Sequence, residues 1–101
     1  PMLEAMAAGC QVIAPRCSGQ LDFLDDENSF LLDVKKISAE KKYQYWKDVS
    51  GAYTFTPNSC DISQKMIDVF NGQKKSYNKS LEDGFSWKKS ATEVIKLYEN
   101  F

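Results

Sequence analysis

The first fifteen residues constrain the fold of this chain most, because they combine a short apolar helix, a helix stop and a buried strand. Pro1 suits the first position of a helix, since it has no backbone N–H and a fixed φ, and Gly9 suits the left-handed position that ends one. The residues between them are apolar on almost every side, which is typical of a helix packed inside a larger body. Residues 12–14, which Pro15 ends, are typical of a strand covered on both faces in a parallel sheet.

Glu4 is the only charged residue of this predicted helix. A carboxylate in the first turn is favoured by the helix dipole and is seldom fully buried without a partner. From the residues alone, two interpretations stay open: Glu4 complements the dipole, or it contacts a ligand.

A second buried strand is expected at 30–32, after a turn of helix at 21–24 and a turn at 25–28 whose polar side chains hydrogen-bond their own backbone. Two such strands with crossing helices predict an α/β fold with a parallel sheet. The three consecutive acids of the turn point in different directions, so a solvated turn is favoured over a metal site.

Residues 34–57 form the most aromatic region. Ser38 can cap a helix that ends before Gly51, and the β-favouring run 52–56 predicts an extra edge strand or an extended loop that stops at Pro57. The aromatic side chains could contact an acceptor or a partner, although packing in a satellite core is the commoner outcome.

Three helices are expected in the last forty residues. Asp61 and Gln64 have the spacing of a capping box for a helix that ends at residues 71–72, and the lysine-rich segment 73–83 predicts a marginal surface helix. Ser86 can cap a final helix. The apolar stripe of that helix consists of Trp87, Ala91, Val94, Ile95 and Tyr98.

Composition excludes several functions. The 101 residues, 43% hydrophobic and 27% charged, fit one soluble globular unit, and the net charge of −1 gives no general field to attract nucleic acid, so any phosphate binding must be local. No apolar run or leader predicts a transmembrane helix or a signal peptide. Three cysteines without C-x-x-C spacing argue against disulfides and zinc, and the absence of histidine removes a histidine base or metal ligand from these residues.

Four sequence runs resemble the C-terminal nucleotide-sugar-binding half of retaining GT-B glycosyltransferases, of the family 4 or group 1 type. They are Pro1-x-x-Glu4-Ala-Met-Ala-Ala-Gly-x-x-Val-Ile-Ala, Ser18-Gly19, Asn28-x-Phe30-Leu-Leu and Phe85-Ser-Trp87. The resemblance implies part of a Rossmann-like parallel sheet layered with helices. Residues 1–101 would be the C-terminal portion of a donor-binding domain, with an atypical insertion at about 34–57, where this family passes quickly from strand to helix.

The resemblance also implies donor-binding residues. Glu4 matches the second of two glutamates that bracket seven residues in the family, and its implied role is to accept hydrogen bonds from the donor ribose. The backbone of Met2 and Leu3 would lie near the sugar phosphates, which Arg16 could also face. Gly19 matches the second glycine of the family's Gly-Gly-x-x-Glu loop. In that loop Ser18 replaces the first glycine, and Asp22 replaces the glutamate.

The function so implied is transfer of a sugar from a nucleoside diphosphate sugar to a glycan, lipid or small-molecule acceptor, with retention of anomeric configuration and without metal or cofactor. The first glutamate, the diphosphate-binding loop, the catalytic groups and the acceptor-binding domain would lie upstream, so the isolated fragment is expected to be inactive. The enzyme would be cytoplasmic, or it would lie at the cytoplasmic face of a membrane. In the second case, only parts of the enzyme outside these residues would contact the membrane.

A noncatalytic α/β interaction or regulatory module derived from the same fold is the alternative, which Ser18 and the insertion favour. A dinucleotide-binding oxidoreductase is disfavoured, because the chain has no G-x-G-x-x-G motif.

Overall fold

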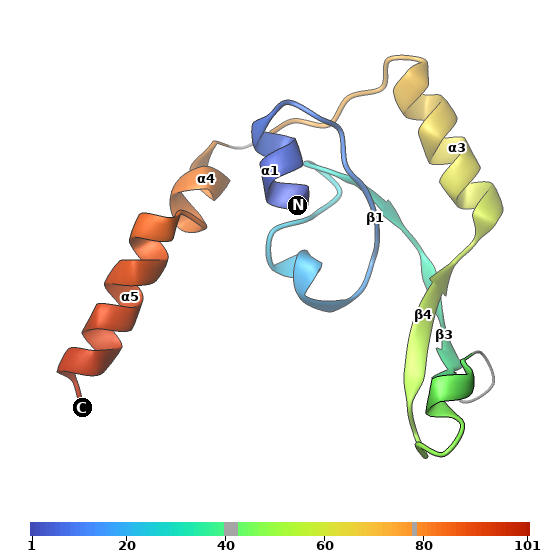
Figure 1. Cartoon of the computed structure of the whole chain (residues 1–101). Helices are drawn as coiled ribbons and strands as arrows, with labels where there is room; N and C mark the ends of the chain where they lie inside the picture. The colour runs from blue at the N-terminus through green and yellow to red at the C-terminus, as the bar shows by residue number, and fades with distance from the viewer. Residues whose placement is uncertain (40–42, 78) are drawn as a thin grey trace. The chain divides into compact units, whose positions relative to one another are not determined.

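The computed structural model describes residues 1–39, 43–77 and 79–101 (Figure 1). The chain is a mixed α/β protein with one small parallel sheet and one small antiparallel sheet within these residues. It divides into two compact units, one of residues 11–76 and one of residues 1–10 together with 77–101. The described strands belong to the 11–76 unit.

A parallel pair of short strands, β1 (Ile13–Pro15) and β2 (Phe30–Leu32), lies at the centre of the 11–76 unit. The pairing continues past both ends of β1, because the amide that opens β2 donates to the Val12 carbonyl and the Arg16 amide donates to the carbonyl that ends β2, each at 2.8 Å. Every residue of β2 is buried. Parallel pairing and full burial of residues 30–32 are therefore confirmed, although β1 begins one residue later than predicted.

The buried apolar residues of this unit come from both strands and from the segments that flank them. They are Val12, Ala14, Leu24, Phe30, Leu31, Leu32 and Ala39. The loop after β1 forms a 3-10 helix, η1 (Ser18–Asp22), so the helical turn predicted at 21–24 begins three residues earlier. The helix α3 (Ser59–Phe70) contacts β1 and β2.

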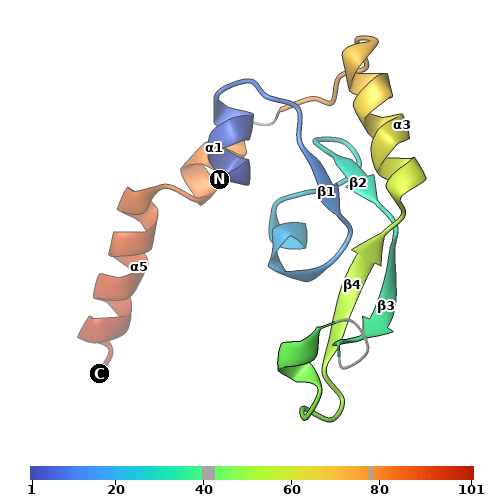
Figure 2. The same cartoon turned by 45° about the vertical axis from the view of Figure 1, so that its right-hand side comes forward.

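An antiparallel hairpin of β3 (Val34–Ser38) and β4 (Tyr53–Pro57) continues directly from β2 (Figure 2). The extra strand predicted at 52–56 is confirmed as β4. Pro57 lies at the end of β4, which suits a residue that has no N–H to donate to a ladder.

The helix predicted from Ser38 to Gly51 is confirmed only in part. Ser38 pairs with Tyr53 as the last residue of β3, whereas Ala39 is helical and its carbonyl accepts the Tyr43 amide at 2.9 Å. A 3-10 turn, η2 (Gln44–Trp46), follows, so the described residues do not form one continuous helix up to Gly51. Residues 40–42 of the predicted helix lie outside the described residues. Pairing of Ser38 with Tyr53, fifteen residues away, overrides the local helical pattern at Ser38, which is a weak preference that tertiary contacts readily reverse.

The predicted satellite core of aromatic residues is also not formed by the tyrosines of this region. The side chains of Tyr43, Tyr45 and Tyr53 are exposed. A two-stranded hairpin has no second layer to cover both of its faces, so aromatic side chains on it remain accessible to solvent.

The N-terminus predicted for α3 at Asp61 is wrong by three residues. Asn58 is the N-cap, and its side-chain oxygen accepts the Cys60 amide at 2.8 Å. Gln64 does not complete a capping box but donates to Asp68 Oδ1 at 2.9 Å. The earlier cap is favourable because it leaves Asp61 in the first turn, where a carboxylate complements the helix dipole.

The other unit contains three helices, α1 (Met2–Ala7), α4 (Ser80–Gly84) and α5 (Trp87–Glu99). Gly9 has a φ of +85°, which confirms the predicted left-handed stop after α1, and the Ser86 hydroxyl accepts the Lys89 amide at 3.2 Å, which confirms the predicted cap of α5. The surface helix predicted at 73–83 is shorter, because only α4 forms, and residue 78 lies outside the described residues. None of the described helices is long and apolar enough to cross a membrane.

Candidate functional site

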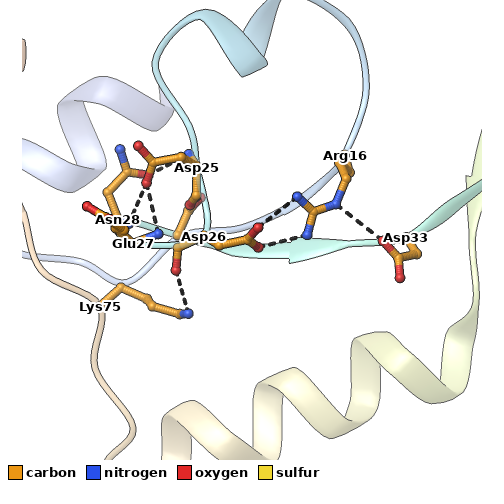
Figure 3. Close-up of polar contacts among 8 residues, drawn as sticks. Arg16, Asp25, Asp26, Glu27, Asn28, Asp33 and Lys75 are labelled. Carbon is orange, nitrogen blue, oxygen red and sulfur yellow. Dashed lines mark hydrogen bonds and ion pairs between the residues drawn. The ribbon is translucent and has the colours of Figure 1, made fainter.

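Arg16 and Asp33 immediately follow the two parallel strands, so both lie at the carboxyl ends of β1 and β2, the side on which open α/β sheets bind ligands. Arg16 Nε donates to Asp33 Oδ1 at 3.2 Å (Figure 3). This pair is the starting point of a network of charged groups.

The Arg16 guanidinium also forms an ion pair with Asp26, which lies in the turn before β2. Two nitrogens of the guanidinium donate to the two carboxylate oxygens of Asp26, at 3.0 and 2.7 Å, so the pair is bidentate. The Arg16 side chain is 40% exposed, and Asp26 is more exposed than that. The hydrogen bonds that Arg16 donates hold the pKa of Asp26 below its usual range, and the same bonds, accepted by Asp26, raise the pKa of Arg16.

The turn at 25–28 positions Asp26 through hydrogen bonds to its own backbone, as predicted. Asp25 Oδ1 accepts the amides of Glu27 and Asn28, each at 2.9 Å, and Asn28 Oδ1 accepts the Asp25 amide at 3.0 Å. The Asn28 side-chain amide donates to the Phe23 carbonyl at 2.8 Å. These side chains are used to shape the backbone, which leaves the Asp26 carboxylate to face Arg16 (Figure 3).

A distant segment anchors the same turn. Lys75 Nζ donates to the Asp26 carbonyl at 2.6 Å, and the backbone amide of Lys75 donates to Gln11 Oε1, also at 2.6 Å. The Ser76 amide donates to the Glu27 carbonyl at 3.1 Å. The sequence interpretation missed this role of Lys75, because its partners lie 49 and 64 residues away and no local pattern identifies them.

An open groove adjoins the carboxyl end of β2. It runs from Asp33 along the Lys35 and Ile37 side of β3 to Cys60 and Asp61 in the first turn of α3, and its volume is about 820 Å³. Small-molecule sites commonly have volumes of about 300–1,000 Å³, so the groove is large enough for a ligand.

The residues predicted to bind a donor lie in two separate segments. Met2, Leu3 and Glu4 form the first turn of α1, where the Glu4 side chain is 83% exposed and lies 2.6 Å from the Pro1 nitrogen. Gly19 is exposed in η1, three residues after Arg16. The structure brings Arg16 together with Asp26 and Asp33, which the sequence interpretation did not assign to the site.

Ser18 has a φ of +61°, and it is the one non-glycine residue with a positive φ in the described part of the chain. The left-handed region costs an L-residue with a Cβ roughly 1–2 kcal/mol, and glycine occupies it readily. A glycine would therefore suit position 18 on conformational grounds alone.

Ser18→Gly is accordingly expected to raise the free energy of unfolding by about 0.5–1 kcal/mol, because the left-handed strain is removed and only part of that gain is offset by the more flexible unfolded chain. Urea denaturation followed by circular dichroism measures the change. The matched control is Ser63→Gly in the interior of α3, which should lower stability by about 0.5–1 kcal/mol. A loss of stability at both positions would contradict the strain at Ser18.

The pKa of Asp26 is expected to rise toward its ordinary value of about 3.9 when Arg16 is replaced by methionine, because the bidentate hydrogen bonds are lost. Because Asp26 has a lower pKa in the folded protein than in the unfolded chain, its ionised form stabilises the fold at pH values above the ordinary pKa. This stabilisation is lost as the pH falls through the lowered pKa. NMR titration of the Asp26 carboxyl carbon measures the pKa of Asp26 in the unmodified protein and in the Arg16→Met variant. The control Lys88→Met removes a charge on α5 and should leave the titration of Asp26 unchanged. An unchanged midpoint in R16M would show that the ion pair of Arg16 with Asp26 does not form in solution.

The other reactive groups add little to this site. Cys10, Cys17 and Cys60 are free thiols. In residues 1–39, 43–77 and 79–101, no three His, Cys, Asp or Glu side chains gather in a way that could hold a metal ion.

Comparison with protein-family models, with curated proteins and with solved structures found no match for this chain.

Proposed function

We propose that residues 1–101 are the C-terminal portion of the donor-binding domain of a retaining GT-B glycosyltransferase, with a Rossmann-like sheet that residues outside this chain would complete. The observation that carries the proposal is the agreement between the sequence runs and the local structure. The run that contains Glu4 forms a short helix, a left-handed stop at Gly9 and most of β1. The run that begins at Asn28 ends in β2, which pairs with β1 in parallel.

The loop after β1 supports the same proposal. In the family that the chain resembles, a glycine pair follows this strand, and here the first glycine is replaced by Ser18, which nevertheless keeps a left-handed φ. A loop that retains the backbone conformation favoured by the replaced glycine is expected if it descends from a glycine-containing loop. The groove beside Asp33 lies at the strand ends where such folds bind ligands.

In this proposal the exposed Glu4 carboxylate accepts hydrogen bonds from the two ribose hydroxyls of the donor, because a carboxylate can accept from both at once. The leaving diphosphate is stabilised by backbone amides and basic groups, most of them upstream, so that the bond to the anomeric carbon can break. Arg16 can bind a phosphate by exchanging Asp26 or Asp33 for phosphate oxygens, since an exposed ion pair is only weakly stabilising.

The experiment is to assay the longer enzyme that contains residues 1–101 against uridine, guanosine and adenosine diphosphate sugars, with NMR of the anomeric proton of the product. The expected result is transfer from one donor class with retained configuration, and no transfer by the 101-residue chain alone, since half a cleft cannot position both reactants. Inversion of configuration, or a longer protein that binds none of these donors, would contradict the proposal.

A noncatalytic module of the same fold is the second candidate, and one observation favours it. The guanidinium of Arg16 is already occupied by two carboxylates, so the loop presents a neutralised cation to a ligand. In that case the longer protein would bind no nucleotide sugar, and R16M would leave its interactions with partners unchanged.

A further inference from the structure

The hairpin of residues 34–57 differs in charge from the rest of the chain. It contains five lysines and two acidic residues, a net charge of +3, whereas the other 77 residues contain eight basic and twelve acidic residues, a net charge of −4. The nearly neutral total therefore conceals a basic hairpin attached to an acidic remainder. A local field of this kind attracts a polyanion to the hairpin alone.

The same hairpin exposes large apolar side chains. Tyr45 is 95% exposed and Tyr53 is 54% exposed, and Val49 is exposed in the loop between η2 and β4. Figure 1 shows η2 at the end of the hairpin that lies away from β1 and α3 within this unit. The hairpin thus ends in a tip with tyrosine and valine side chains in solvent.

One lysine and two aromatic rings lie together on one face of the hairpin. Lys36 pairs with Phe55 across the ladder, and Lys36 Nζ lies 3.8 Å from the centroid of the Tyr53 ring. The rings of Tyr53 and Phe55 are in edge-to-face contact, with centroids 5.5 Å apart. The ammonium group and the rings are therefore held together as one ordered surface.

We propose that this hairpin docks on an anionic lipid bilayer, with Lys36 and Lys47 at the phosphate level and its tyrosine tip in the interfacial region. Tyrosine is favoured at that boundary because its ring is apolar and its hydroxyl is polar, and each lysine close to an anionic surface strengthens binding about fivefold. A planar bilayer meets only the tip, and it can take up Val49, which a nucleic acid cannot stack on. This proposal does not rest on the proposed binding of a nucleotide sugar.

The test is co-sedimentation of the full chain with vesicles of phosphatidylcholine alone and with about 30% phosphatidylserine, at low salt and at about 0.5 M salt. We expect binding to the anionic vesicles only, and its loss at high salt. The double variant Lys36→Glu and Lys47→Glu should weaken partitioning by at least about 25-fold. Tyr45→Ser should weaken binding to the anionic vesicles at low salt.

The matched control carries the same charge reversal outside the hairpin, with Lys88→Glu and Lys89→Glu on α5. It should change partitioning by less than about twofold, because these lysines lie outside the hairpin. Circular dichroism of each variant shows that it is folded. Equal losses in the two double variants, no binding to anionic vesicles, or tighter binding to single-stranded RNA than to the vesicles would each overturn the proposal.

Discussion

Replacing Phe30 by alanine is expected to lower the free energy of unfolding by about 3–5 kcal/mol, the loss typical of deleting a buried aromatic ring. Phe30 is 4% exposed at the start of β2, and the ammonium group of Lys75 lies 5.1 Å from the centroid of its ring. Removing the ring leaves a cavity beside the parallel strand pair. Because small domains are stable by only about 5–15 kcal/mol, this loss is a large part of the total and should shift the urea midpoint strongly downward.

Phe70 on α3 is the matched control, because the same side chain is 90% exposed there. Phe70→Ala should change stability by less than about 0.5 kcal/mol. Urea unfolding followed by circular dichroism compares the two variants. Similar losses at both positions would mean that residues 30–32 are not the core of this unit.

The features that were predicted correctly from the sequence have local causes. Gly9 and Gly72 end helices because only glycine takes a left-handed φ without strain, and both have a positive φ. The turn at 25–28 and the cap at Ser86 depend on side chains that bond backbone groups two to three residues away. Such interactions are fully specified by neighbouring residues.

The features that were missed depend on distant partners. The strand β3 exists because residues 53–57 pair with it, and a local helical pattern around Ser38 could not reveal that. At the candidate site, Arg16 was noted as a cation that could face phosphate, but its contacts with Asp26 and Asp33 arise only when β1 and β2 lie side by side. The sequence identified the residue and not its partners.

For Glu4, the resemblance implies a role in binding the donor, and the structure shows that its side chain is exposed. A carboxylate in the first turn of α1 that is largely exposed is available to a ligand, and its removal should not disturb packing. Any effect of replacing it on donor binding would therefore arise at the binding step and not from unfolding.

Calorimetric titration of the proposed full-length glycosyltransferase with nucleotide sugars tests this most directly, in the variant Glu4→Ala and in Glu99→Ala at the exposed end of α5. Losing the hydrogen bonds from two ribose hydroxyls to a charged acceptor should weaken donor binding by about 1–3 kcal/mol, or about 5- to 150-fold in Kd. Glu99→Ala should bind the donor as the unmodified enzyme does. An unchanged donor Kd in Glu4→Ala would remove Glu4 from the site and contradict the proposed role of the helix that carries it.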